Sequence, residues 1–145
     1  MQNCSGSFKY LIASRINLVE INKQPSSRRI LCVEDNQDTC EVVGFIFRDY
    51  EMVFAGTVAE ALPHIENEVF DLYMLDNWLP DGSGVELCKK IRSLRPDSPI
   101  IFTSAVGMKN DIDLALAAGA NRYILKPVEP DNLRKVVKEL LDADV

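Results

Sequence analysis

The chain has 145 residues and a formal net charge of −6. This length fits one domain with its own hydrophobic core, or one domain with a short extension, and 47% hydrophobic with 26% charged residues is typical of a water-soluble globule. The acidic balance argues against binding to nucleic acid or to an anionic membrane, and no apolar run reaches the length of a membrane span.

The N-terminus has no charged start followed by an unbroken apolar segment, so we expect no signal peptide. We predict that residues 1–28 are an extension ending in a polar linker, and that residues 29–145 form one domain. Five apolar residues of the extension lie at roughly helical spacing: Phe8, Leu11, Ile12, Ile16 and Val19. The extension is either a short amphipathic helix that docks on the domain or on a partner, or a frayed tail.

The four cysteines show no CxxC spacing, and three of them lie within apolar patterns. They are Cys4, Cys32, Cys40 and Cys88. This usage predicts reduced, mostly buried thiols in a cytoplasmic protein.

Five short apolar runs after the linker are predicted strands, at residues 29–34, 51–56, 70–76, 98–105 and 121–126. Five segments with helical periodicity alternate with them, at residues 36–50, 57–69, 83–95, 109–118 and 129–142. Thr57 and Ser83 are candidate N-caps, Gly119 ends the fourth helix, and Pro130 lies in the first turn of the last helix. The alternation predicts an α/β fold in which helices cover both faces of a parallel sheet.

Polar side chains follow four of the five predicted strands. Glu34 and Asp35 end the first strand, Asp76 the third, Ser104 the fourth and Lys126 the fifth. Because the carboxyl ends of parallel strands lie at one edge of a sheet, we expect these groups to share one basin. Taken singly, each has a structural alternative: the acids can cap a helix or a turn, the serine can stabilise a turn, and the lysine can be solvated.

Three carboxylates in one basin repel one another, and a like-charge pair about 4 Å apart costs roughly 4 kcal/mol at an effective dielectric near 20. Lys126 alone does not neutralise three acids. Mg²⁺, with Mn²⁺ as a substitute, would supply the missing charge, because it prefers oxygen ligands and accepts a phosphate in its shell. The set therefore predicts phosphoryl transfer, with Asp76 as the nucleophile that forms an acyl phosphate.

Four strings, in order along the chain, resemble the receiver domain of two-component response regulators: LCVEDN, LDNWLPDGSG, IIFTSA and YILKPV. The resemblance covers nearly all of the chain after the linker. It implies a flavodoxin-like, doubly wound five-stranded sheet in the order 2-1-3-4-5. The implied function is that of a stand-alone, CheY-like phosphorelay response regulator, a signalling phosphoprotein that is not an enzyme and that carries no output domain in this chain.

The resemblance also implies roles for the matching positions. Glu34, Asp35, Asp76 and the backbone carbonyl of Trp78 would hold Mg²⁺, and Asp76 would be the phospho-acceptor. Lys126 would pair with Asp76 and then with the phosphoryl group.

The switch residues follow from the same resemblance. Ser104 would donate a hydrogen bond to a phosphoryl oxygen, Tyr123 would be the aromatic switch, and the Lys126–Pro127 peptide is expected to be cis. Thr103 should point to the opposite face, because side chains alternate along a strand. Two departures from the commonest family pattern are mild: Glu-Asp replaces an Asp-Asp pair, and serine replaces threonine at position 104.

Trp78 and Val106 should flank the acyl phosphate, and we predict that their bulk excludes water and prolongs the life of the phospho-form. The packing alternative for Trp78 stays open. The expected phosphoryl donor is a histidine kinase or a histidine phosphotransfer protein. A downstream protein would bind the face formed by residues 109–118, 121–126 and 129–142, with the chain a monomer or a phosphorylation-dependent dimer.

The sequence leaves three rival interpretations. The first is a receiver-like interaction module that works without phosphorylation. The second, a phosphatase with an aspartyl nucleophile, usually needs a second Asp at the position of Trp78, which cannot transfer protons. The third, a histidine phosphotransfer protein, would be helical throughout, and His64 is predicted to lie on a helix surface.

Overall fold

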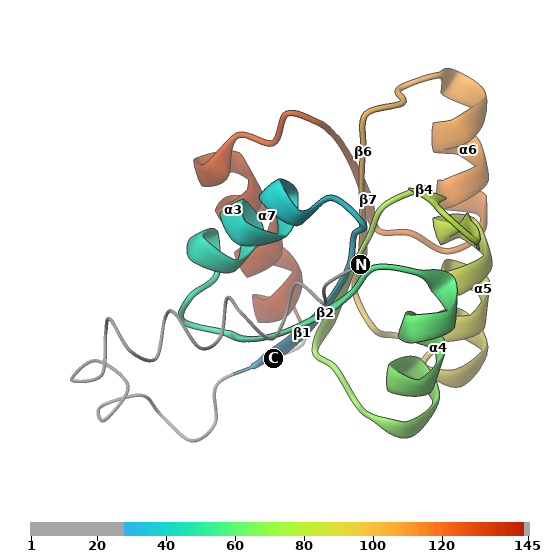
Figure 1. Ribbon diagram of the computed structural model, residues 1–145, viewed down its shortest axis with the longest axis horizontal. Coiled ribbons are helices and arrows are strands. Elements are labelled where there is room, and N and C mark those ends of the chain that lie inside the picture. The colour runs from blue at the N-terminus through green and yellow to red at the C-terminus, as the bar shows by residue number, and fades with distance from the viewer. Residues whose placement is uncertain (1–27, 144–145) are drawn as a thin grey trace.

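The computed structural model describes residues 28–143, and Figure 1 shows how its elements are arranged. Cys4 and the apolar stripe of the extension lie outside the described residues. Five parallel strands form the central sheet: β1 (Arg29–Val33), β2 (Glu51–Ala55), β3 (Leu72–Leu75), β6 (Ile100–Ser104) and β7 (Arg122–Leu125). Their order in the sheet is β2-β1-β3-β6-β7, so the predicted flavodoxin-like order is confirmed.

Helices cover both faces of the sheet, as predicted. One layer holds α3 (Gln37–Ile46) and α7 (Pro130–Asp142), and the other holds α4 (Val58–Asn67), α5 (Gly84–Leu94) and α6 (Lys109–Ala117) (Figure 1). Along β1, Ile30 and Cys32 join the core under α3 and α7, whereas Leu31 and Val33 join the core under α4 and α5. The central strands are mostly apolar because both of their faces are buried. None of the described helices combines the length and apolarity needed to cross a membrane.

Polar side chains cap the N-terminal ends of four helices, and at α7 the cap is Glu129, which accepts from the Asn132 N–H at 2.7 Å. Asn36 accepts a hydrogen bond from the backbone N–H three residues ahead at 2.9 Å, Thr57 does so at 3.0 Å, and Ser83 at 3.3 Å. The caps at Thr57 and Ser83 confirm the prediction, whereas Asn36 was not singled out. Gly119 follows α6 with a φ of 116°, the left-handed conformation that favours glycine at a helix end.

The helix predicted over residues 36–50 is too long, because α3 ends at Ile46. Phe47 leaves the helix with φ −107° and ψ 35°, and the Tyr50 N–H donates to the Phe47 carbonyl at 2.9 Å. The turn brings the two rings edge to face at 5.7 Å. The helical periodicity of the sequence continues past Ile46, but the packing of these two aromatic rings ends the helix there.

Two other details differ from the sequence prediction. Residues 78–83 form a small antiparallel hairpin, β4 (Trp78–Leu79) and β5 (Gly82–Ser83), where a simple turn was expected. The edge strand β7 exposes Arg122 and Leu125. The expectation that every strand is covered on both faces is therefore wrong for β7.

Candidate phosphoryl-acceptor site

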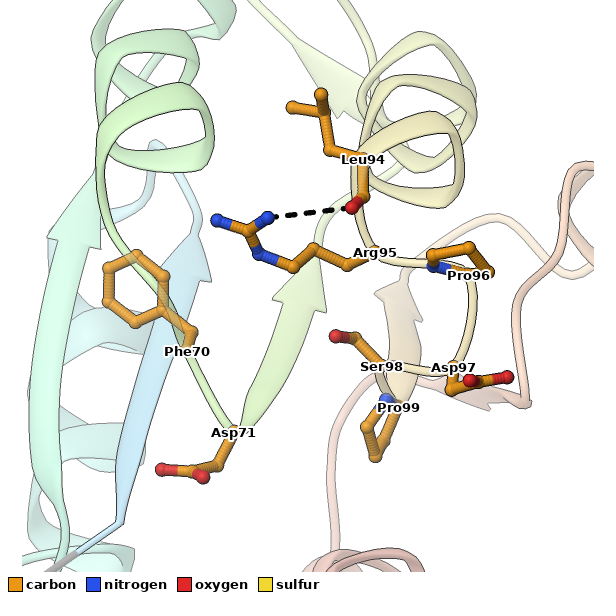
Figure 2. Close-up of a pocket in the computed structure, with 8 residues that line it drawn as sticks. All are labelled: Phe70, Asp71, Leu94, Arg95, Pro96, Asp97, Ser98 and Pro99. Carbon is orange, nitrogen blue, oxygen red and sulfur yellow. Dashed lines mark hydrogen bonds between the residues drawn. The ribbon is translucent and has the colours of Figure 1, made fainter.

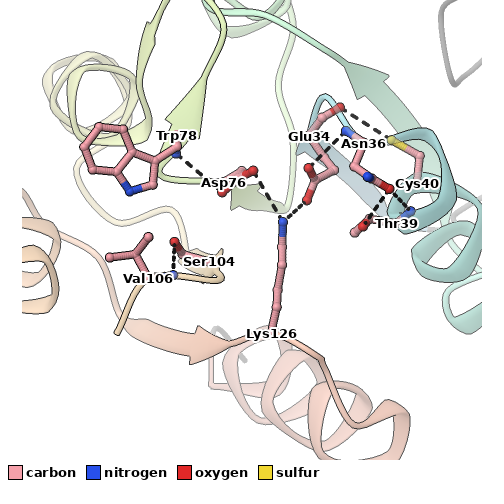
Figure 3. Close-up of polar contacts among 9 residues, drawn as sticks. All are labelled: Glu34, Asn36, Thr39, Cys40, Asp76, Trp78, Ser104, Val106 and Lys126. Carbon is pink, nitrogen blue, oxygen red and sulfur yellow. Dashed lines mark hydrogen bonds and ion pairs between the residues drawn. The ribbon is translucent and has the colours of Figure 1, made fainter. Parts of the chain in front are cut away.

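The site lies where β1, β3, β6 and β7 end. These strands are adjacent and parallel, so the side chains that follow them converge on one edge of the sheet. Figure 3 shows Glu34, Asp76 and Lys126 pointing toward one another from three of these strand ends.

Three carboxylates form an acidic cluster at this edge. One oxygen from each of Glu34, Asp35 and Asp76 lies within 4.8 Å of the others. Glu34 is 2% exposed and Asp76 is 7% exposed, while Asp35 is half-buried. The sequence predicted this convergence, and an all-oxygen donor set of this kind fits a hard divalent cation such as Mg²⁺.

Lys126 bridges two of the acids. Its Nζ donates to Glu34 Oε1 at 2.5 Å and to Asp76 Oδ2 at 3.3 Å. Burial lowers the pKa of Lys126, but the hydrogen bond to Glu34 and the charges of Glu34 and Asp76 outweigh it, so the net shift is upward. The pair with Asp76 was expected from the family resemblance, whereas the shorter bond to Glu34 was not.

Burial is the largest influence on the pKa of Glu34. It raises the pKa of Glu34 to about 7, with the charge of Asp76 acting in the same direction and Lys126 opposing it. The Asn36 backbone N–H also donates to Glu34 Oε2 at 3.2 Å. The basin therefore carries more acidic groups than its single lysine neutralises, which is a second reason why a cation fits there.

Asp76 combines the role of a turn-forming residue with a place in the acidic cluster. Its Oδ1 accepts from the Trp78 N–H at 3.4 Å, and its own N–H donates to the Val33 carbonyl at 2.9 Å. The first contact is the structural alternative considered for this residue. The second ties β3 to β1 next to the acidic pair.

Ser104 and Tyr123 meet at the loop after β6. Ser104 is fully buried, and its Oγ accepts from the Val106 N–H at 3.2 Å. The Tyr123 hydroxyl donates to the Val106 carbonyl at 2.7 Å, and its ring stacks on Phe102 at 5.9 Å. The predicted hydroxyl and the predicted aromatic residue therefore hold the same short loop.

Trp78 and Val106 lie on the same side of the basin as Ser104 (Figure 3). The indole is 59% exposed, and Val106 is half-buried. A residue packed in the core would be far less exposed, so the packing alternative for Trp78 is disfavoured. The Lys126–Pro127 peptide is cis, as expected.

Two residues that follow Asp76 have structural roles that the sequence did not predict. A Cβ at Gly84 would lie 2.4 Å from the Asp76 carbonyl oxygen, so the close return of the chain requires glycine there. Asp81 accepts from the Val58 and Ala59 N–H groups at 2.7 and 3.0 Å, which fixes the hairpin to the start of α4. The Pro-Asp-Gly-Ser-Gly string signals a turn but does not reveal these partners.

A separate hollow of about 430 Å³ lies at the opposite end of the sheet (Figure 2). Apolar lining comes from Phe70, Leu94 and two prolines. Asp71 on its wall accepts from the Arg29 N–H at 2.7 Å. It holds none of the acidic-cluster residues.

The sequence profile of the response regulator receiver domain matches residues 30–138. The chain belongs to this family. Receiver domains are signalling modules that bind Mg²⁺ in an acidic pocket and work with histidine kinases or phosphotransfer proteins.

Curated relatives of this receiver domain are transcriptional regulators. The alkaline phosphatase synthesis transcriptional regulatory protein PhoP of Bacillus subtilis is 32% identical over 117 residues, which is 79% of this chain and 49% of the relative. The transcriptional regulatory protein ZraR of Escherichia coli is 29% identical over 114 residues, 77% of this chain and 26% of the relative. The chain thus spans half or less of the length of these two relatives.

Solved structures of receiver domains superpose closely. A CheY-like receiver domain protein from Methanospirillum hungatei has a TM-score of 0.78 and 39% identity, covering 81% of this chain and 96% of that one. The receiver domain of the sensor histidine kinase PA1611 from Pseudomonas aeruginosa has a TM-score of 0.74 and 26% identity, covering 81% and 99%. Its crystal structure has a magnesium ion in the active-site cleft.

Proposed function

We propose that Asp76 accepts a phosphoryl group from a phosphohistidine of a kinase or phosphotransfer protein, in a reaction that depends on Mg²⁺. The observation that carries the proposal is the cluster of three carboxylates within 4.8 Å, with the Lys126 ammonium shared between two of them. This arrangement has few other uses, because uncompensated carboxylates repel one another.

An oxygen of the Asp76 carboxylate attacks phosphorus, the new O–P bond forms, and the N–P bond to the donor imidazole breaks. The electron pair of the broken N–P bond stays on the imidazole nitrogen. Lys126, within hydrogen-bonding distance of Asp76, offsets the charge of the transferring group. Glu34, Asp35, Asp76 and the Trp78 carbonyl are the proposed ligands of Mg²⁺, which when bound supplies positive charge to the phosphoryl oxygens.

The phosphoryl group adds about −1.5 to −2 of charge and new acceptor oxygens. Ser104 Oγ accepts from the Val106 N–H, so its own proton is available for donation to a phosphoryl oxygen. Movement of Ser104 would draw the loop at Val106 inward and break the Tyr123–Val106 hydrogen bond. Tyr123 would then be free to turn, which is the proposed switch.

The signal would reach a protein target through the surface of α6, β7 and α7. Leu114 and Leu125 on this surface are apolar and exposed, which suits a protein contact. We propose no enzymatic role beyond the chain's own phosphorylation and dephosphorylation, and a monomer or phosphorylation-dependent dimer as the working form.

Acetyl phosphate labelling tests the proposal. We expect intact-mass spectrometry to show one phosphoryl group per chain in the presence of Mg²⁺, and none after chelation of the metal. Asp76→Asn should abolish labelling. The matched control Asp97→Asn, an exposed residue at the other end of the sheet, should leave it unchanged. No labelling of the wild type would favour the interaction module that works without phosphorylation, and equal labelling of Asp76→Asn would place the acceptor at another residue.

A further inference from the structure

An apolar groove, here called the α3–α7 groove, lies between α3 and the start of α7. It consists of two hollows that share Val42: one of about 490 Å³ beside Lys126 and Pro127, and one of about 330 Å³ between Phe45 and Arg134. Val42 and Phe45 are 50% and 60% exposed and lie almost one turn apart on α3. Neighbouring exposed apolar side chains of this size indicate a surface that another segment covers.

Among the residues that line the two hollows, the unpaired charges are acidic, although the Arg48 guanidinium lies over the Phe45 ring at 4.7 Å. Asp38 and Glu41 line it and are exposed, and neither forms an ion pair within residues 28–143. The basic side chains are already engaged, since Arg134 pairs with Asp131 at 2.9 Å and Lys126 is held by the acidic cluster. The groove therefore suits an occupant that combines apolar with basic side chains.

The first 27 residues of the same chain have this chemistry. If residues 8–19 are helical, five apolar residues share one stripe, with Arg15 within it and Lys9 at its edge: Phe8, Leu11, Ile12, Ile16 and Val19. Residues 1–27 carry three basic side chains and one acidic, a formal charge of +2, in a chain whose total is −6. Exposure of such a stripe to water is unfavourable, and covering it lowers the free energy.

The described part of the chain begins on the side of the sheet covered by α3 and α7, where the groove lies. Arg28 Nη1 donates to the Leu141 carbonyl at 2.6 Å, so the chain enters beside the C-terminal end of α7, one of the two walls of the groove. From Leu141 back to Arg134 is about 10 Å along the helix at 1.5 Å per residue. Residues 20–27 span up to roughly 26 Å, which is ample.

We propose that residues 8–19 pack into the α3–α7 groove of their own chain, with the apolar stripe on Val42 and Phe45. Lys9 and Arg15 compensate the charges of Asp38 and Glu41. Docking does not depend on the proposed function.

Photo-crosslinking in the full chain tests the docking. A benzophenone amino acid replaces Val42, and equal amounts of ¹⁴N- and ¹⁵N-labelled chains are mixed before irradiation and peptide mass spectrometry. We expect crosslinks from position 42 to residues 8–19 of the same chain, at a yield independent of protein concentration. Ile12→Asp should lower this yield about ten-fold or more, because it would bury an unpaired carboxylate. Ser14→Asp, a matched control off the stripe, should lower it far less.

Three results would overturn the proposal. Crosslinked peptides that join a ¹⁵N-labelled chain to a ¹⁴N-labelled chain would show that a second copy of the protein occupies the groove. Crosslinks from position 42 that do not include residues 8–19 would indicate that another protein occupies the groove. Equal loss of yield in Ile12→Asp and Ser14→Asp would show that the apolar stripe is not what binds. None of these measurements involves Asp76, so failure of docking and failure of phosphorylation remain distinguishable.

Discussion

Lys126 determines the charge balance of the acidic basin at the scale of single residues. Its ammonium is shared by Glu34 and Asp76 before any phosphoryl group arrives. The sequence indicated that a lysine would follow the fifth strand, and alternation along the fourth strand selected Ser104 over Thr103. The bond to Glu34 was beyond prediction, because it depends on how deeply Glu34 is buried.

Replacement of the lysine tests its role in transfer. Lys126→Met keeps most of the side-chain length but removes the ammonium, so we expect acetyl phosphate labelling of Asp76 to slow by about 100-fold. Labelling is followed by intact mass against time. Lys135→Met, on the exposed side of α7, is the control and should match the wild type. An unchanged rate in Lys126→Met would remove Lys126 from the mechanism.

Trp78 and Val106 test the lifetime of the phospho-form. In Trp78→Asn with Val106→Glu, polar groups that can orient water replace apolar bulk, and we expect dephosphorylation to be about ten-fold faster. The decay of purified phospho-protein after removal of the donor measures this rate. Trp78→Phe keeps an apolar ring and should decay like the wild type. The same decay in the double variant would mean that neither side chain shields the acyl phosphate.

At the scale of elements, Asp81 connects the β4–β5 hairpin to α4. Hydrogen bonds from the Ala59 and Val58 N–H groups lower the pKa of Asp81. A carboxylate with a depressed folded pKa stabilises the fold above its unfolded pKa of about 3.9, and this contribution is lost as the pH falls through the folded value.

Asp81→Asn should therefore be less stable than the wild type at neutral pH, and the difference should shrink as the pH falls below about 4. Urea unfolding at several pH values measures it. Asp97→Asn is the matched control, expected to unfold with the wild type at neutral pH. A difference that persists undiminished in acid would exclude the ionised carboxylate as the cause.

Arg92 joins α5 to the turn between α6 and β7. Its guanidinium donates to the Gly119 carbonyl at 3.0 and 2.7 Å, to the Ser98 carbonyl at 2.5 Å and to Asn121 Oδ1 at 2.9 Å. Lysine cannot reproduce this planar set of donors. Gly119 lies so close that a Cβ there would meet the Arg92 side chain at 2.6 Å.

We expect Arg92→Lys to lower the free energy of unfolding by roughly 2 kcal/mol, because several acceptors, most of them part-buried, lose their donors. Urea denaturation measures the change. Lys90→Ala, an exposed site on the same helix, should change stability by less than about 0.5 kcal/mol. Equal values for the two variants would contradict a connecting role for Arg92.

Periodicity located every major strand and helix but not all of their ends, and residue type predicted two of the four side-chain caps, Thr57 and Ser83. α3 stops four residues before the predicted end, because Phe47 and Tyr50 pack together outside the helix. The β4–β5 hairpin has two-residue strands, which are too short to give an alternating pattern. Local sequence therefore determined the type of each element, and tertiary packing determined its limits.

At the scale of the whole molecule, parallel strands explain why the site was predictable. Once the strands alternate with helices, groups separated by many residues must meet at one edge of the sheet, as Glu34, Asp76 and Lys126 do. The need for glycine at position 84 could not be predicted in this way, because it arises from the approach of residue 84 to the Asp76 carbonyl.

The central claim is that Asp76 is the phospho-acceptor, and chemical mapping tests it most directly. Borohydride reduces an acyl phosphate to an alcohol, so peptide mass spectrometry after treatment with acetyl phosphate and then borohydride identifies the modified carboxylate. We predict reduction at position 76 alone, only when Mg²⁺ is present. Reduction at Glu34, Asp35 or another carboxylate in place of Asp76, or no reduction at any position, would contradict the claim.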